Sequence, residues 1–152
     1  MVQISGFISI ADNELLNKII SLHKAGLSID ELYEKIWGIV DAETVDLLLF
    51  ENQEIAKVNR KLWEESNLVN TGLMMKVLQS SNRSPLLHNL KNIKQRALIM
   101  TGAFDRNTGL SISKIIQREL PHSSMVIFGK SAHFPELEET EKFVRVVEEF
   151  LT

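Results

Sequence analysis

The sequence predicts an α/β fold in which a small parallel sheet carries a large helical insertion. Two short runs, 97–101 and 125–128, are continuously apolar, as are strands that helices cover on both faces. Helical periodicity follows each run, over about 110–120 and about 138–151, which gives a βαβα unit. Nearly everything before residue 90 also has helical periodicity. The expected order is one strand, a block of helices and then the βαβα unit.

Residues 1–10 are assigned to the first strand. Val2 and Ile4 are apolar and Gly6 closes the run, so a strand over 2–5 is predicted. This strand would begin almost at the first residue of the sequence.

Residues 11–90 form the predicted helical block, and its helices have recognisable start signals. Asp12 or Asn13 can cap the first helix, because a short polar side chain there accepts hydrogen bonds from free backbone amides. Ser28 and Glu31 have the spacing of a capping box, which starts the second helix. Later start signals stand at Asp41, near Asn52 and at Pro85, and stop signals stand at Gly26 and Gly38.

Composition excludes several classes of function. The 152 residues carry a net charge of -3 and no basic stripe, so no nucleic-acid partner is expected. Without cysteine there is no disulfide, thiol nucleophile or thiolate metal site, and the histidines are not spaced as metal ligands. No apolar stretch approaches the ~20 residues that span a bilayer, and no signal peptide is recognisable. We expect a cytoplasmic protein that does not bind membranes and uses no metal or other cofactor.

Residues 91–152 contain the βαβα unit and the candidate catalytic residues. Asp105 follows the first apolar run and His133 follows the second, so both lie in loops that leave a parallel sheet at the same edge. A carboxylate followed by an imidazole is the order of the last two members of a Ser…Asp…His triad. In such a triad the imidazole takes the serine proton, while the carboxylate fixes its tautomer. Ordinary loop residues are the alternative interpretation of the same pair.

The surrounding sequence supports the triad interpretation. Residues 93–105 resemble the seventh strand and acid loop of α/β hydrolases, 120–128 resemble their eighth strand, and 129–143 resemble their histidine loop and closing helix. By the same alignment, 2–5 is similar to the sixth strand and 11–89 to the helical cap. The two loops are similar to those of proline iminopeptidases and related esterases. The resemblance implies a partial α/β-hydrolase fold, comprising strands six to eight with an inserted cap, and a small ester or aminoacyl substrate.

The resemblance covers only the second part of the family's pattern. The Gly-x-Ser-x-Gly turn that carries the nucleophile and the oxyanion-hole loop have no counterpart in this sequence. Ser5 and Ser131 lie outside such a turn, so neither is expected to be a nucleophile. Smaller departures are Arg96, where the family commonly has proline, and Ala132, where it commonly has glycine. We expect the C-terminal portion of a serine hydrolase, truncated before its nucleophile and inactive alone. The alternative is a non-catalytic, hydrolase-derived module that binds a partner or self-associates.

Partners follow from the same interpretation. A first strand without the family's fifth strand would present an open edge, and proteins cover such edges to avoid aggregation. We expect this edge to be covered by a second copy of the chain or by the N-terminal portion of a hydrolase. A small ester or aminoacyl compound would be the substrate of the complemented protein.

Five residues are candidates for a substrate pocket beneath the cap: Ser5, Phe7, Trp37, Trp63 and Met74. Apolar residues at helical spacing are more often part of a core, and the core interpretation is favoured for each apolar one. The acidic pair Glu138 and Glu139 is expected on the solvated face of the last helix, near its amino end, where negative charge suits the helix dipole.

Overall fold

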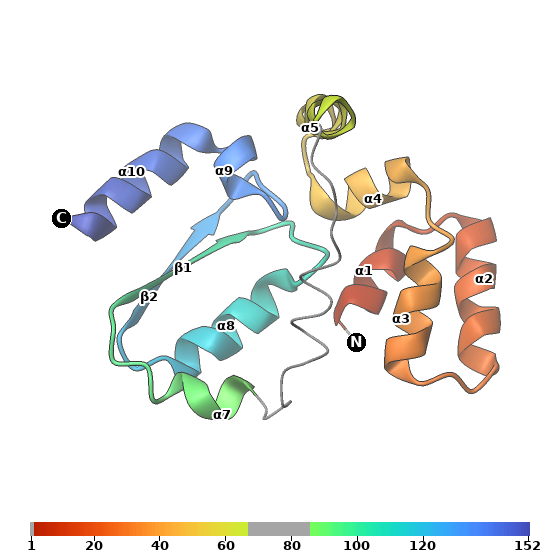
Figure 1. Cartoon of the computed structure of the whole chain (residues 1–152), viewed down its shortest axis with the longest axis horizontal. Coiled ribbons are helices and arrows are strands. Elements are labelled where there is room, and N and C mark those ends of the chain that lie inside the picture. Colours follow the sequence, from red (N-terminus) through yellow and green to blue (C-terminus); the bar gives the residue numbers. More distant parts are fainter. Residues whose placement is uncertain (1, 67–85) are drawn as a thin grey trace.

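The computed structural model describes residues 2–66 and 86–152, and Figure 1 shows a helical group beside a group that contains the sheet. The helical group consists of α1 (Val2–Ile10), α2 (Asn13–Lys24), α3 (Ile29–Trp37), α4 (Ala42–Leu49) and α5 (Gln53–Glu65). The second group consists of α7 (Leu86–Leu90), β1 (Ala97–Gly102), α8 (Gly109–Glu119), β2 (Ser123–Phe128), α9 (Pro135–Glu138) and α10 (Thr140–Leu151). The predicted order of helices followed by a βαβα unit is present.

The predicted strand over residues 2–5 is wrong, because these residues belong to helix α1. A strand needs a neighbouring strand for its backbone hydrogen bonds, whereas a helix satisfies its own. The helical conformation also buries Phe7 completely against α3, with its ring centroid 5.2 Å from that of Trp37. Tertiary packing of Phe7 therefore outweighs a short apolar pattern that carries little information by itself. Among the described residues, the sheet consists of β1 and β2 alone.

The caps of the helical group match the predicted start signals. Asp12 accepts a hydrogen bond from the amide of Leu15, and Asp41 accepts one from Thr44. The capping box of Ser28 and Glu31 is complete, since each side chain accepts from the other residue's backbone amide. Asn52 caps α5, which matches the start signal predicted near this residue. Pro85, the last predicted start signal, lies outside the described residues.

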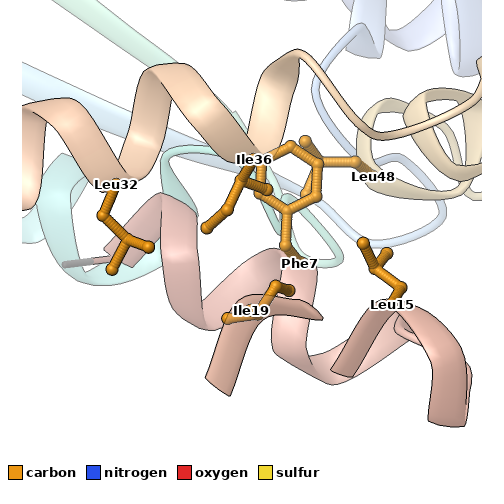
Figure 2. Packing of buried hydrophobic residues seen from close by; sticks show 6 residues of the cluster. All are labelled: Phe7, Leu15, Ile19, Leu32, Ile36 and Leu48. Carbon is orange, nitrogen blue, oxygen red and sulfur yellow. The ribbon is translucent and has the colours of Figure 1, made fainter. Parts of the chain in front are cut away.

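The helical group encloses a core of apolar side chains from four helices. Its buried members are Phe7, Leu15, Ile19, Leu32, Ile36 and Leu48. Figure 2 shows these side chains converging from α1, α2, α3 and α4. Each is at most 8% exposed, so these helices close a core around one another.

The two strands are parallel and in register, from Ala97 beside Ser123 to Gly102 beside Phe128. They therefore end at the same level. Figure 1 shows α8 on one side of the strands and α10 on the other, which agrees with the prediction that helices cover both faces. None of the helices described is both long enough and apolar enough to cross a membrane.

Candidate active site

The site is built where the two parallel strands end. The loop after β1 carries Asp105, and the loop after β2 carries His133. Gly102 lets these loops approach closely, because a Cβ atom there would lie 1.9 Å from the carbonyl oxygen of Ala132. A second close approach joins α1 to the acid loop, where a Cβ atom on Gly6 would lie 1.9 Å from the carbonyl oxygen of Arg106. Both positions therefore require glycine.

Both carboxylate oxygens of Asp105 accept hydrogen bonds. Its Oδ1 accepts from the amides of Asn107 and Thr108 at 2.8 and 3.0 Å, and its Oδ2 accepts from the Thr108 hydroxyl at 2.6 Å. The side chain is only 6% exposed. Burial by itself raises the pKa of Asp105, but hydrogen bonds from His133 and Thr108 outweigh burial and hold this pKa well below its usual range. The carboxylate is therefore fixed in place and ionised at neutral pH.

His133 faces this carboxylate, with Nδ1 3.1 Å from Oδ2 of Asp105. The hydrogen bond to Asp105 raises the pKa of His133 above its ordinary value, and burial opposes this effect only in part. When the ring is neutral, a proton on Nδ1 donates to the carboxylate and leaves the lone pair on Nε2. This is the tautomer that a general base in a triad needs.

The structure therefore brings together the two residues that the sequence singled out as acid and base. Nε2 of His133 lies 3.5 Å from Nδ2 of Asn107, and Oδ1 of Asn107 is buried without a partner. The ring edge of His133 also packs on Phe134, with centroids 5.0 Å apart. Nδ1 is held by Asp105, so Nε2 is the nitrogen available for proton transfer.

The predicted solvated position of Glu138 and Glu139 is wrong. Glu139 accepts hydrogen bonds from the Lys130 amide at 2.8 Å and the Ser131 hydroxyl at 2.6 Å, and Glu138 accepts one from the Ala132 amide at 2.6 Å. Burial opposes ionisation of Glu139, but the bonds from Ser131 and Lys130 lower its pKa. Both carboxylates hold the histidine loop, Glu138 from the end of α9 and Glu139 from the position before α10.

The remaining candidates lie in different places. Phe7 is fully buried in the helical core and contacts Trp37, as the core interpretation expects. Trp63 is 61% exposed and lines a cleft of about 420 Å³ between α4, α5 and Phe134. Ser5 is exposed on α1, and Met74 lies outside the described residues.

The two serines considered as nucleophiles differ in their surroundings. Ser131 is completely buried, and its hydroxyl donates to Glu139, as expected for a loop residue that hydrogen-bonds locally. Ser5 is exposed on α1. Within residues 2–66 and 86–152, no group of three or more His, Asp or Glu side chains is arranged to hold a metal ion.

Several site residues were not predicted from the sequence. Asn107 and Thr108 hold the carboxylate of Asp105 through their amides, in an Asx turn that Asn and Thr two and three positions after an Asp could have indicated. Arg106 donates to the carbonyl oxygen of Leu47 at 3.2 Å, and its guanidinium lies 2.7 Å from the carboxylate of Glu51. No local sequence pattern predicts these contacts, because Leu47 and Glu51 each lie more than 50 positions from Arg106.

Comparisons with known proteins identify the fold. No protein-family model matches the chain. A stretch of 64 residues, 42% of this chain, is 33% identical to a 2-hydroxy-6-oxononadienedioate/2-hydroxy-6-oxononatrienedioate hydrolase of Burkholderia vietnamiensis (strain G4 / LMG 22486) and covers 22% of that protein. An α/β fold family hydrolase from Bacillus anthracis str. Sterne matches over 95% of this chain and 51% of its own, with 22% identity and a TM-score of 0.60.

Two further solved structures agree. A meta-cleavage product hydrolase from Pseudomonas fluorescens IP01 matches over 76% of this chain and 47% of its own, with 19% identity and a TM-score of 0.54. An esterase from Exiguobacterium antarcticum covers 88% of this chain and 47% of its own, with 15% identity and a TM-score of 0.57. The chain thus spans about half the length of these structures. It has part of an α/β-hydrolase fold, as the resemblance predicted, but without the predicted strand over residues 2–5.

Proposed function

We propose that this chain provides the acid, the base and the cap of a serine hydrolase that cleaves ester or aminoacyl bonds, including peptide bonds. The nucleophile and the oxyanion hole would come from an N-terminal hydrolase portion with the Gly-x-Ser-x-Gly turn. The observation that carries this proposal is the 3.1 Å contact between Nδ1 of His133 and the buried carboxylate of Asp105, at the carboxyl ends of adjacent parallel strands. The hydrolase fold and the hydrolase names of the similar proteins support the class of reaction.

In this mechanism His133 moves one proton in each direction. Nε2 accepts the serine proton as the serine oxygen forms a bond to the substrate carbonyl carbon, and Asp105 stabilises the resulting imidazolium. The imidazolium then gives that proton to the leaving alcohol or amine as its bond to the carbonyl carbon breaks. Water repeats the sequence against the acyl-enzyme and releases the acid. The chain alone has a base with no serine to activate, so we expect it to be inactive.

Several features suit the missing portion. Among the described residues no strand pairs with the second edge of β1, and an N-terminal hydrolase portion would place a strand there. The cleft lined by Trp63 and Phe134 lies next to His133 and suits an apolar acyl or side-chain group of a small substrate. The names of the similar proteins include a dienedioate hydrolase and an esterase, so they support hydrolysis without selecting one substrate.

The decisive experiment compares the chain alone with the chain co-expressed with the polypeptide encoded directly upstream of it. Hydrolysis of p-nitrophenyl acetate and of aminoacyl p-nitroanilides is measured on both samples. We expect turnover only in the co-expressed sample, and we expect His133→Ala to abolish it. Turnover by the chain alone that depends on His133, or inactivity of the co-expressed sample, would overturn the proposal.

A second candidate function is a non-catalytic module that buries its exposed apolar surface by self-association. Val58, Leu62 and Trp63 on α5 are each 61% exposed, and Val58 and Leu62 are one helical turn apart. A stable homodimer that stays inert in the co-expressed sample would favour this function. Mass measurement by light scattering on the assayed sample separates the two candidates.

A further inference from the structure

One carboxylate joins two distant segments beside the candidate site. Oε1 of Glu138 accepts hydrogen bonds from the amides of Glu51 and Asn52, at 2.8 and 2.7 Å. Its Oε2 accepts from the amide of Ala132, directly before His133, at 2.6 Å. Glu51 and Asn52 form the junction between α4 and α5, so Glu138 binds the cap-like helices and the histidine loop at the same time.

The same junction has two more connections to the site. The amide of His133 donates to the carbonyl oxygen of Leu49 at 2.9 Å, near the end of α4, where carbonyl groups lack partners within the helix. Arg106, next to Asp105, donates to the carbonyl oxygen of Leu47 at 3.2 Å and forms an ion pair with Glu51. Both site loops therefore hold the α4–α5 junction.

The loop before His133 has little room to move by itself. Ala132 is completely buried, and its carbonyl oxygen lies over Gly102, where even one added carbon atom would collide with it. A displacement of Glu138 therefore changes the path of the backbone into His133 instead of being absorbed by slack in the loop.

We propose that Glu138 is a positioning residue that couples the place of the α4–α5 junction to the orientation of the His133 imidazole. Displacing α4 and α5 would move the Glu138 carboxylate, shift Ala132 and weaken the hydrogen bond between His133 and Asp105. The catalytic meaning of this coupling rests on the proposed function, whereas the coupling itself does not.

A ligand could act on this coupling through the neighbouring cleft. Leu49 and Trp63 line it from α4 and α5, and Phe134 lines it from the histidine loop. The Phe134 ring lies 5.0 Å from both the His133 ring and the Phe50 ring, measured between centroids. A molecule in the cleft would therefore press on the junction and on the residue after His133 together. Substrate binding would adjust the base in the same step.

The test follows the imidazole directly and needs no turnover. The full chain, labelled with ¹⁵N-histidine, is titrated by NMR, and His133→Gln identifies the His133 signals among the four histidines. Asp105 and Glu136, whose charges raise the pKa of His133, are unaltered in this test. In Glu138→Gln, one side-chain oxygen becomes an NH₂ group, which cannot accept from a backbone amide. We expect the pKa of His133 to fall toward its ordinary value and its Nδ1 proton signal to weaken.

Three further variants separate positioning from general destabilisation. Glu149→Gln removes an exposed carboxylate of α10 and should leave the His133 titration unchanged. Glu51→Gln removes the charge that pairs with Arg106 but keeps the backbone amide bound to Glu138, so it should shift the His133 titration less than Glu138→Gln does. Glu51→Pro removes one amide bound to Glu138, and Phe50 before it already has the extended conformation that proline requires (φ −127°, ψ 142°). In Glu51→Pro we expect the pKa of His133 to fall, by less than it falls in Glu138→Gln.

The coupling is wrong if folded Glu138→Gln titrates like the unaltered chain. If Glu138→Gln does not fold, an unchanged His133 titration in Glu51→Pro would instead show that the coupling is wrong. A shifted titration together with inactivity of the co-expressed sample would leave the coupling intact and overturn the proposed function instead.

Discussion

The helical group and the sheet-containing group bury their apolar residues in different ways. The helical group closes a core of six side chains that are each at most 8% exposed. In the second group α8 and α10 have no buried residue at all. Apart from Leu120, the buried residues from β1 onward gather at the site end: Thr101, Gly102, Phe128, Ser131, Ala132 and Pro135.

This difference shows what holds the candidate site. The helices of the second group cover the sheet only in part, because most strand residues remain partly exposed. The ends of the strands are nevertheless tightly packed, and hydrogen bonds from the α4–α5 junction reach them. The closed helical core therefore supports the site from the side, while the half-covered sheet aligns its two loops.

The largest expected effect comes from opening the helical core. Phe7→Ala removes a fully buried ring and should destabilise the chain by about 3–5 kcal/mol, the usual cost of this change in a core. Urea unfolding followed by circular dichroism measures it. Phe104→Ala, at a ring that is 42% exposed, is the matched control and should cost much less. An equal loss of unfolding free energy in Phe7→Ala and Phe104→Ala would contradict the difference in burial between the helical group and the sheet-containing group.

The next largest effect comes from the packed end of the sheet. A Cβ atom in Gly102→Ala would meet backbone oxygens of Ser131 and Ala132, which cannot rotate away, so we expect a loss of about 3 kcal/mol. The histidine loop should also move, and the NMR signal of the His133 Nδ1 proton should be lost. Gly129→Ala, with nothing within 4 Å of the added atom, should change neither property. A normal His133 signal in Gly102→Ala would contradict this account.

A medium effect is expected from the Asp105–His133 pair, and it depends on pH. The pKa of Asp105 is lowered in the folded chain, so its contribution is complete above the unfolded-state pKa of about 4 and is lost as pH falls through the folded pKa. The pKa of His133 is raised, so its contribution is complete below about 6.5 and is lost as pH rises through the folded pKa.

Between these limits both groups are charged and the pair stabilises the fold most. Asp105→Asn should therefore cost about 1.5 kcal/mol near pH 5.5, in the range for hydrogen bonds to charged groups. The cost should shrink at higher and lower pH. Urea midpoints across this range measure it, and Asp12→Asn, which retains an N-capping side chain, is the control. A cost that does not vary with pH would show that the pair is not ionised.

The smallest effect on stability is expected on the exposed face of α5. Leu62→Gln changes a side chain that is 61% exposed, so the free energy of unfolding should change by no more than about 0.5 kcal/mol. The second candidate function requires self-association through this face, so it predicts that association weakens in Leu62→Gln, which analytical ultracentrifugation measures. Lys61→Gln on the same helix should leave association unchanged. A large loss of stability in Leu62→Gln would mean that α5 belongs to a packed core.

Local patterns predicted much of the fold. The capping signals at Asp12, Ser28 and Asp41 each begin a helix, because a cap involves only residues within one turn. The apolar runs became the two parallel strands, since continuous apolar character is typical of strands in a parallel sheet, although only the ends of these strands are buried. The predicted strand over residues 2–5 is wrong because the conformation of this segment depends on what packs beside it. Phe7 is buried in the helical core, and α1 is therefore a helix.

In the candidate site, too, local sequence patterns were predictive and contacts between distant residues were not. Asp105 and His133 could be proposed because each directly follows a strand, and parallel strands bring such positions together. Glu138 was misplaced because its acidic sequence context is typical of a solvated helix face. Its partners at Glu51 and Asn52 lie more than 80 positions away, and only the folded chain brings them within reach.

The carboxylate of Glu138 also has a consequence for the exchange of backbone hydrogens with solvent. The amides of Glu51, Asn52 and Ala132 lie outside any helix or strand, where exchange is usually fast. Because all three donate to one side chain, they should exchange slowly and with a common free energy of opening. Two loops that are far apart in the chain would then behave as a single cooperative unit.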